Sequence, residues 1–222
     1  MFTKRVFLIL VITLWVTVPF SGCGVSKDNK IYIPGTVFSY SAYEISPNKD
    51  TIPHTINLVV KKAGFSAVFG QTPIEYHYLD IKDGGEALVE KTGITENEKR
   101  VSIHPPRFNY MTFAQIAPQP SVNLPPSVGT SREITLEVVK GWDSLNNQNI
   151  EQVENVIAIE DIKVAEKEYK NCVVTEGSNV SHIDKLGKYS IKYWFHEEYG
   201  FVKMVYTKPD STVVILEVKE VK

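Results

Sequence analysis

The side chains that most often carry acid–base or metal chemistry are spread thinly along this sequence of 222 residues. Two adjacent acid pairs, Glu160-Asp161 and Glu197-Glu198, could supply the paired carboxylates of a hydrolase. Neighbouring residues of a strand point to opposite faces, so neither pair converges by itself. The histidines lack the i, i+4 spacing of a helical zinc site: His54, His77, His104, His182 and His196. We therefore expect no catalytic residue, no metal and no cofactor, with a zinc site assembled in three dimensions as the alternative.

Common enzyme signatures are missing as well. The sequence holds no G-x-S-x-G nucleophile elbow, no P-loop, no G-x-G-x-x-G, no H-E-x-x-H and no C-x-x-C. The prediction is that the protein is not an enzyme. A hydrolase with unrecognised motifs is the less favoured alternative.

The start of the chain has the spacing of an export signal. Lys4 and Arg5 precede an uncharged stretch, Val6 to Phe20, and the small residues Ser21 and Gly22 lead to Cys23. Charged, apolar and small segments in this order are typical of a secretory signal peptide. The apolar stretch is shorter than the roughly 17 to 25 residues of a membrane-spanning helix. Export is therefore favoured over simple spanning.

Residues 20–23, Phe-Ser-Gly-Cys, resemble the bacterial lipobox, although Phe20 stands where Leu is usual. The resemblance implies that residues 1–22 are a lipoprotein signal peptide and that Cys23 carries diacylglycerol and palmitate-type acyl chains. Residues 23–30 would then be a lipidated tether, holding the protein to the extracytoplasmic face of a membrane in the bacterial cell envelope. Each buried CH₂ adds about 0.8 kcal/mol, so two or three chains hold firmly. The alternatives are an ordinary cleaved signal and an uncleaved anchor.

Composition limits the partners of the mature chain. Removing 22 of 222 residues leaves 200, and losing Lys4 and Arg5 changes the formal charge from −2 to −4. Such a chain has no bulk positive charge to attract nucleic acid, which is not an expected partner. With Cys23 acylated, Cys172 has no cysteine to pair with, so we expect a small buried hydrophobe there.

Apolar residues recur at every second position through most of the remaining chain. This period predicts a mainly β fold with little helix: antiparallel, strongly twisted sheet or sheets, or a half-open barrel. The clearest strand is Lys188 to His196, and turns separate it from strands at Phe201 to Thr207 and Thr212 to Val221. These three strands predict a C-terminal antiparallel meander. Trp194 is expected on the lysine-bearing face, half exposed.

The remaining elements follow from the same period. Strands are expected at 37–45, 56–60, 65–69, 74–82, 86–91, 100–104, 108–116, 134–138, 156–164 and 172–176, and the only helix candidate is 144–155. Four prolines mark residues 117–131 as a connection between an N-terminal β half, 31–116, and a C-terminal β half, 132–222. Whether the halves share one sheet or form two lobes is left open by the sequence.

Aromatic side chains on the expected strands are the best candidates for a ligand site. They could line an apolar hollow, and the alternative is that they are packed core, since aromatic residues dominate sheet packing. The candidates are Tyr76, Tyr78, Phe108, Tyr110, Phe113, Tyr189, Tyr193 and Phe195.

Four short segments of the C-terminal third form a recognisable series: 160–164 (EDIKV), 169–173 (YKNCV), 193–195 (YWF) and 200–203 (GFVK). This series resembles that of a group of uncharacterised bacterial lipoproteins and envelope proteins related to the LolA/LolB-like class. The resemblance implies a curved antiparallel sheet around an apolar hollow, and with it a non-catalytic module that binds an apolar ligand or envelope component. A scaffold that holds a protein partner is the alternative. The family's Pro and Gly are absent from residues 165–168, which leaves the tight turn there in question.

Overall fold

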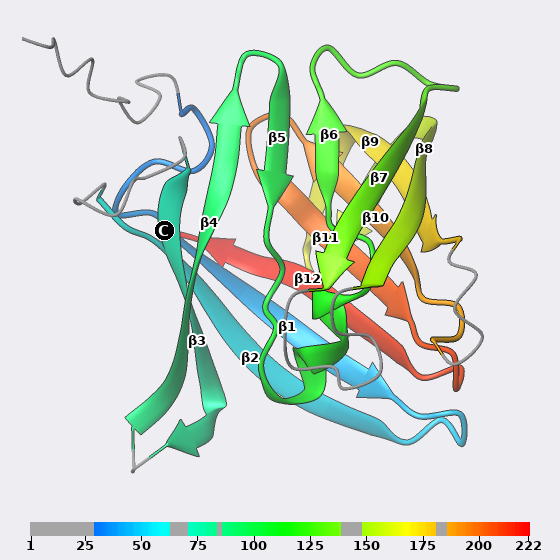
Figure 1. Ribbon diagram of the computed structural model, residues 1–222. Coiled ribbons are helices and arrows are strands. Elements are labelled where there is room, and N and C mark those ends of the chain that lie inside the picture. The colour runs from blue at the N-terminus through cyan, green and yellow to red at the C-terminus, as the bar shows by residue number, and fades with distance from the viewer. Residues whose placement is uncertain (1–28, 63–70, 84–85, 139–147, 181–185) are drawn as a thin grey trace, which may run out of the picture.

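The chain forms one antiparallel sheet of twelve strands in a computed structural model that describes residues 29–62, 71–83, 86–138, 148–180 and 186–222 (Figure 1). The strand order is β6-β5-β4-β3-β2-β1-β12-β11-β10-β9-β8-β7. The elements are β1 Val37–Ile45, β2 Thr51–Val60, β3 Thr72–Asp83, β4 Glu86–Asn97, β5 Arg100–Ile103, η1 Asn109–Gln115, β6 Ser121–Asn123, β7 Ser131–Val138, β8 Gln148–Val164, β9 Lys167–Asn179, β10 Ser190–His196, β11 Gly200–Thr207 and β12 Val213–Val221. The predicted mainly β, antiparallel class with little helix is confirmed.

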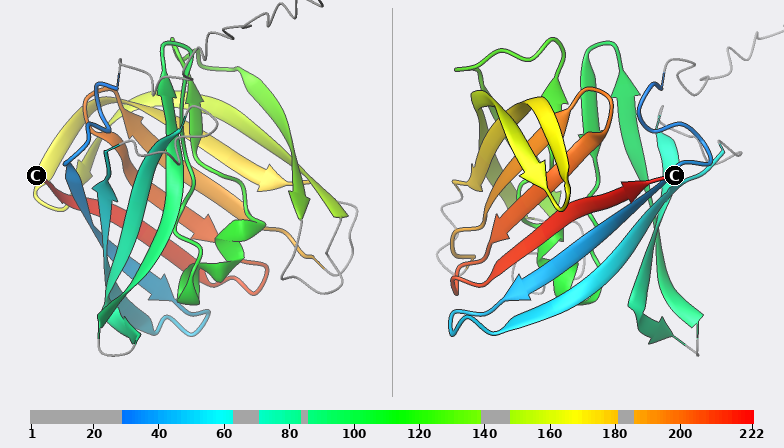
Figure 2. Two further views of the ribbon diagram at one scale, coloured as in Figure 1. Left: turned by 60° about the vertical axis from the view of Figure 1, so that its left-hand side comes forward. Right: turned by 180° about the vertical axis from the view of Figure 1, so that it is seen from behind.

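The sheet is strongly twisted and rolls on itself without closing (Figures 1 and 2). In the described part of the chain, β6 and β7 are its two edges. They lie near each other, since Arg132 of β7 donates a hydrogen bond to the Ser121 hydroxyl of β6 at 2.8 Å. A half-open barrel with a seam between β6 and β7 is the result.

The first and last strands join the two halves of the chain. β1 pairs with β12 over its whole length, with Tyr40 opposite Val218 and Ala42 opposite Leu216. Because β1 also pairs with β2 and β12 with β11, the sheet runs on without a break. Both halves therefore belong to one sheet, which the sequence had left open.

The C-terminal meander is confirmed as β10-β11-β12. Ile191, Tyr193 and Phe195 of β10 are buried, as their alternation predicts. Trp194 lies on the other face near two lysine ammonium groups, yet it is only 9% exposed. Its indole N–H donates to Glu160 of β8 at 2.8 Å, so the expected half exposure is wrong.

Two expected elements are of another type. Residues 148–155 of the helix candidate 144–155 form the first half of β8, whose buried positions include the polar Gln152 and Glu154, so no apolar period marks that half. Residues 144–147, like the strand expected at 65–69, lie outside the described residues. The strand expected at 108–116 is the short 3₁₀ helix η1, which Asn109 begins with a φ of 52° that no strand allows.

Two turns depart from what proline and glycine alone would suggest. The proline-rich stretch 117–131 contains β6, which pairs with β5. The β8–β9 hairpin is tight although Pro and Gly are absent, because Val164 pairs with Lys167 across a two-residue loop. Ala165 takes the positive φ of 50° that the loop requires.

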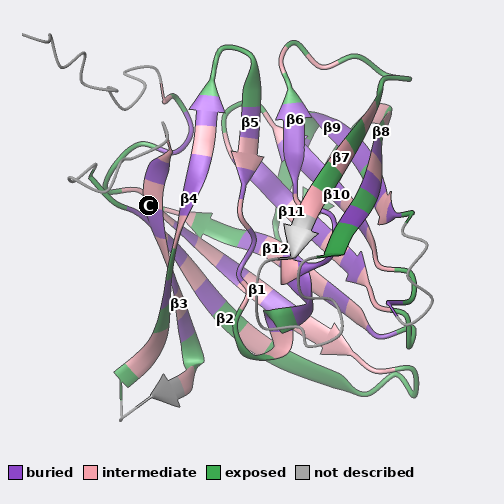
Figure 3. Cartoon of the chain, in the orientation of Figure 1, coloured by how far each residue is buried: buried purple, intermediate pink, exposed green. Residues whose placement is uncertain are grey.

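Aromatic side chains fill the interior of the rolled sheet. Buried positions recur along most of its strands (Figure 3). The largest side chains that are less than 2% exposed include Tyr32, Phe38, Tyr40, Tyr76, Tyr78, Tyr193, Phe201 and Tyr206. Several hydroxyls are satisfied by the main chain; Tyr40 donates to the Phe201 carbonyl at 3.1 Å and Tyr76 to the His104 carbonyl at 2.8 Å. Among the described residues, no helix has the length and apolar character needed to cross a membrane.

Candidate functional site

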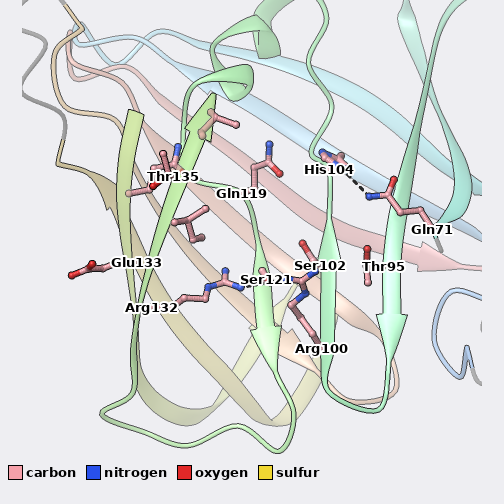
Figure 4. Close-up of a pocket in the computed structure, with 13 residues that line it drawn as sticks. Gln71, Thr95, Arg100, Ser102, His104, Gln119, Ser121, Arg132, Glu133 and Thr135 are labelled. Atoms are coloured by element: carbon pink, nitrogen blue, oxygen red, sulfur yellow. Dashed lines mark hydrogen bonds between the residues drawn. The ribbon is translucent and has the colours of Figure 1, made fainter. Parts of the chain in front are cut away.

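A groove of about 480 Å³ runs along the seam of the sheet (Figure 4). We call it the seam groove. One wall is the edge of β7, and the other is formed by β4, β5 and the segment that leads into β6. Its lining residues are Gln71, Thr95, Arg100, Ser102, His104, Gln119, Ser121, Arg132, Glu133, Ile134, Thr135, Leu136 and Gln152.

The β7 wall of the seam groove exposes main chain. Residues 132–136 are consecutive and all line the groove. Since consecutive side chains of a strand point to opposite faces, a cavity that touches all five lies against the edge of the strand. β7 pairs only with β8 in the described structure, so this edge carries main-chain N–H and C=O groups without a neighbouring strand.

The opposite wall offers hydrogen-bonding side chains. Figure 4 shows Gln71, His104 and Gln119 around one end of the groove, with Ser102 and Arg100 toward the other. The Nε2 atoms of Gln71 and His104 are 3.4 Å apart. Burial, together with the nearby Arg107 guanidinium, lowers the pKa of His104, so its imidazole is neutral at pH 7. The wall therefore presents neutral donors and acceptors plus the Arg100 cation.

Four side chains connect the two edges of the sheet, and we call them the seam latch: Ser121, Arg132, Glu154 and Tyr193. Arg132 forms an ion pair with Glu154 on β8 and donates to the Ser121 hydroxyl at 2.8 Å. The Tyr193 hydroxyl donates to the Ser121 carbonyl at 2.6 Å. The latch therefore ties β7, β8 and β10 to β6.

Glu154 is a buried carboxyl group of the latch whose hydrogen bonding is incomplete in the described structure. Its side chain is 3% exposed, and its Oε1 has no hydrogen-bond partner among the described residues. Burial raises the pKa of Glu154 to about 7, against the opposing effect of the Arg132 charge. The latch can therefore change its protonation state near neutral pH.

A second pocket, of about 850 Å³, lies beside the start of the described chain, and we call it the N-terminal pocket. Its apolar lining is Ile31, Val101, Leu124 and Phe195, and its acidic lining is Glu96, Glu98, Glu197 and Glu198. The carboxylate of Glu96 accepts the main-chain N–H groups of residues 30, 31 and 32 at 2.7, 2.9 and 3.0 Å. Residues 29–32 are thereby fixed to the sheet next to this pocket.

The candidate aromatic residues do not come together in one hollow. Tyr76, Tyr78 and Tyr193 are at most 1% exposed and lie in the packed core, whereas Phe195 lines the N-terminal pocket. The other four lie toward η1: Phe108 is 41% exposed, Tyr110 stacks on His54 at 3.7 Å, and Phe113 stacks on Tyr189 at 6.2 Å. Cys23, the candidate lipidation site, lies outside the described residues.

The candidate metal ligands also stay apart in the described structure. Of the candidate acid pairs, Glu197 and Glu198 both line the N-terminal pocket, and Glu160 accepts a hydrogen bond from the Trp194 indole. In the described ranges, no three His, Cys, Asp or Glu residues gather as a metal site would need, and His182 falls outside those ranges. His54 pairs with Asp80, and His77 with Glu75 at 3.1 Å. Cys172 is buried, and burial raises the pKa of its thiol to about 11, which keeps it protonated.

Sequence reasoning missed the acids that organise the site. Glu90, Glu96 and Glu154 are 1%, 6% and 3% exposed, and each fixes a distant segment. Glu90, for example, accepts from the Arg107 main chain at 2.7 Å and from the Arg107 guanidinium at 2.9 Å. No local sequence pattern identifies such residues as structural, because their hydrogen-bond partners are many positions away in the chain.

Comparisons with known proteins identify the fold. No family model and no curated protein sequence matches the chain. A candidate exported protein with a YmcC-like fold from Bacteroides fragilis matches with a TM-score of 0.51 and 11% identity, over 86% of this chain and 96% of that one. A candidate lipoprotein from Parabacteroides distasonis matches with a TM-score of 0.53 and 12% identity, over 88% of this chain and 100% of that one.

A LolA superfamily protein from Nitrosomonas europaea covers 87% of this chain and 88% of its own length, at 7% identity and a TM-score of 0.27. The two matches with TM-scores above 0.5 show that the chain shares the fold of these structures. The expected lipoprotein-like fold is confirmed at that level. A closer relation to the LolA/LolB-like class stays a prediction.

Proposed function

We propose that this protein is a lipid-anchored, non-catalytic binding module of the bacterial cell envelope. The order of charged, apolar and small residues before Cys23 supports export and acylation. The descriptions of the two matching structures, one as an exported protein and one as a lipoprotein, agree with that location. In this proposal Cys23 carries the anchor and the rolled sheet is held outside the cytoplasm.

The seam groove carries the binding part of the proposal. Its volume of about 480 Å³ lies within the ~300 to 1,000 Å³ usual for ligand sites. Its walls offer amides, hydroxyls, a neutral imidazole and a free strand edge, which bind by hydrogen bonding. The ligand is an envelope component that presents hydrogen-bonding groups along one side.

A second candidate is an apolar ligand in the N-terminal pocket. Because aromatic side chains fill the interior of the sheet, the N-terminal pocket is where the apolar ligand expected from the sequence could bind. Phe195, Leu124 and Val101 line the pocket there. An apolar group would meet these side chains while its polar part stayed at the acidic rim.

Filling the seam groove tests the first candidate. Ser102 lines the groove on the outward face of β5, and Ser102→Trp would occupy part of the volume. Ser41 is also a half-buried, outward-facing serine, on β1 and away from the groove, so Ser41→Trp is the matched control. The tagged lipoprotein is extracted from its own membranes in mild detergent, and native mass spectrometry records what remains bound.

We expect an envelope component to remain bound to the wild type and to Ser41→Trp and to be lost from Ser102→Trp. Retention by Ser102→Trp, or a wild type that carries nothing under any extraction condition, would refute the groove as the binding site. Loss of a bound lipid from a Phe195→Asp variant, with Ser102→Trp unaffected, would favour the N-terminal pocket.

A further inference from the structure

The direction of the main-chain groups of β7 follows from its pairing. The Val156 N–H donates to the Thr130 carbonyl at 3.0 Å, and the N–H of Val180, the residue after β9, donates to the Glu151 carbonyl at 2.8 Å. Hydrogen-bonded positions alternate in an antiparallel ladder. In the register of this pair, Ile134 lies opposite Gln152. The two hydrogen bonds therefore show that the main-chain N–H and C=O groups of Arg132, Ile134 and Leu136 point toward β8.

Glu133 and Thr135 consequently direct their N–H and C=O groups into the seam groove. Both residues line that groove, as an edge position must. A further strand that lies about 4.8 Å from β7 can form hydrogen bonds with such unpaired main-chain groups, because its own groups have the same spacing. The groove thus offers the hydrogen-bonding pattern of an extended polypeptide.

The far wall of the groove decides how many strands fit. It consists of the chain's own β4, β5 and the approach to β6, so the space beside β7 is bounded on both sides. A second copy of this chain would bring its own β7 with β8 attached, and β8 would have to enter the wall. A single extended segment fits the groove without that conflict.

Charge defines the occupant further. Arg100 projects into the groove in Figure 4 and forms no ion pair within the described structure, whereas the Arg132 charge is already paired with Glu154. Glu133 points away from the other labelled side chains in Figure 4. A carboxylate of the occupant directed into the groove would therefore be complementary to Arg100.

We propose that an extended segment of a partner protein binds along β7 as an added strand, with an acidic side chain directed toward Arg100. This inference rests on the proposed binding role of the seam groove and names its ligand class. Main-chain hydrogen bonds to Glu133 and Thr135 supply the affinity, and the Arg100 contact selects the sequence.

The test uses the full-length lipidated protein in detergent micelles and a phage-displayed library of random decapeptides. Thr135→Pro removes the outward N–H at an edge position, where proline is tolerated, and Thr135→Ala keeps that N–H as the control. An enriched peptide is then synthesised with single N-methyl groups along its backbone. N-methylation removes one peptide N–H donor at a time and needs no protein variant. The proposal can therefore be tested even if Thr135→Pro does not fold.

We expect peptides rich in Asp or Glu that bind the wild type and Thr135→Ala alike and bind Thr135→Pro at least about tenfold more weakly, the effect of losing one buried hydrogen bond. N-methylation should weaken binding at every second position. Arg100→Gln should weaken it about threefold, as for an exposed ion pair.

The proposed added strand would be refuted if N-methylation weakened binding equally at all positions. It would also be refuted if the enriched peptides bound Thr135→Pro as tightly as the wild type. So would dimerisation of the wild type that Thr135→Pro abolishes, because the edge would then serve a second copy. A lipid or glycan lost from Ser102→Trp would contradict this inference while leaving the proposed function intact.

Discussion

Buried carboxylates organise this protein at the scale of single residues. Glu96 is 6% exposed and accepts three consecutive main-chain N–H groups, which fixes residues 30–32 beside the N-terminal pocket. Hydrogen bonds to a charged group contribute about 1.5 to 3 kcal/mol each, and more is lost when a buried donor stays unpaired. One side chain thus connects the segment after the proposed tether to the sheet.

Replacing this carboxylate should be costly. Glu96→Gln exchanges one acceptor oxygen for an NH₂ group that faces a main-chain N–H, so we expect a loss of about 2 kcal/mol or more in the free energy of unfolding. Urea denaturation measures it. Glu98→Gln, two positions away on an exposed side chain, should stay within about 0.5 kcal/mol of the wild type; equal effects of both variants would contradict the role of Glu96.

The seam latch predicts a pH dependence of stability. Burial raises the pKa of Glu154 from 4.5 to about 7 in the folded protein, so the folded state holds this proton more tightly than the unfolded chain does. The resulting stabilisation is fully present below pH 4.5 and is lost as the pH rises through about 7. This rise in the pKa corresponds to about 3 kcal/mol of stabilisation at low pH.

Glu154→Gln isolates this effect. Burial lowers the pKa of His104 and of His196, which makes stability rise with pH, but both groups are present in the wild type and in the variant. The free energy of unfolding of the wild type, minus that of Glu154→Gln, should therefore fall by up to about 3 kcal/mol between pH 5 and pH 8. A difference that does not change with pH would show that Glu154 is ionised throughout.

None of these acids could be predicted to be structural from the sequence. The partners of Glu96 are 64 to 66 positions away, and Glu154 meets Tyr193 of β10, 39 positions on. The candidate aromatic residues show the reverse case. Their alternation predicts burial correctly for Tyr76 and Tyr193, but alternation cannot distinguish a filled interior from a hollow one.

At the scale of elements, the local sequence pattern predicts some strands, whereas others depend on pairing with strands that are distant in the sequence. The β10-β11-β12 meander could be predicted because alternating residues and turn residues agree along adjacent segments. The first half of β8 could not, since residues 148–155 bury Gln152 and Glu154 at core positions, whereas the second half agrees with the strand expected at 156–164. The pattern predicts a strand in place of the 3₁₀ helix η1 because Phe108 and Tyr110 are two positions apart, although Tyr110 and Phe113 within η1 are three apart.

The β10–β11 turn depends on a glycine. Gly200 has a φ of 70°, and a Cβ there would press against the Tyr32 ring and hydroxyl. Gly129, with a φ of 87°, has open space around it. We expect Gly200→Ala to lower the free energy of unfolding by about 2 kcal/mol or more, and Gly129→Ala by about 1 kcal/mol, measured by urea denaturation. Equal losses would show that Tyr32 does not constrain the turn.

At the scale of the whole molecule, one continuous sheet rolls around an aromatic core and stops short of closure. The latch joins the two edges at one point, and the seam groove lies along the free edge of β7. An open edge is an aggregation hazard in a free protein, and a bound partner strand removes it. The proposed anchor on Cys23 would keep that edge close to envelope components.

The anchor is the claim on which the envelope role depends, and the intact mass of the protein extracted from its native membranes tests it most directly. We expect a polypeptide of residues 23–222 that carries diacylglycerol on the Cys23 sulfur. A chain that begins at Met1, or one that begins at Cys23 with a free thiol, would contradict it.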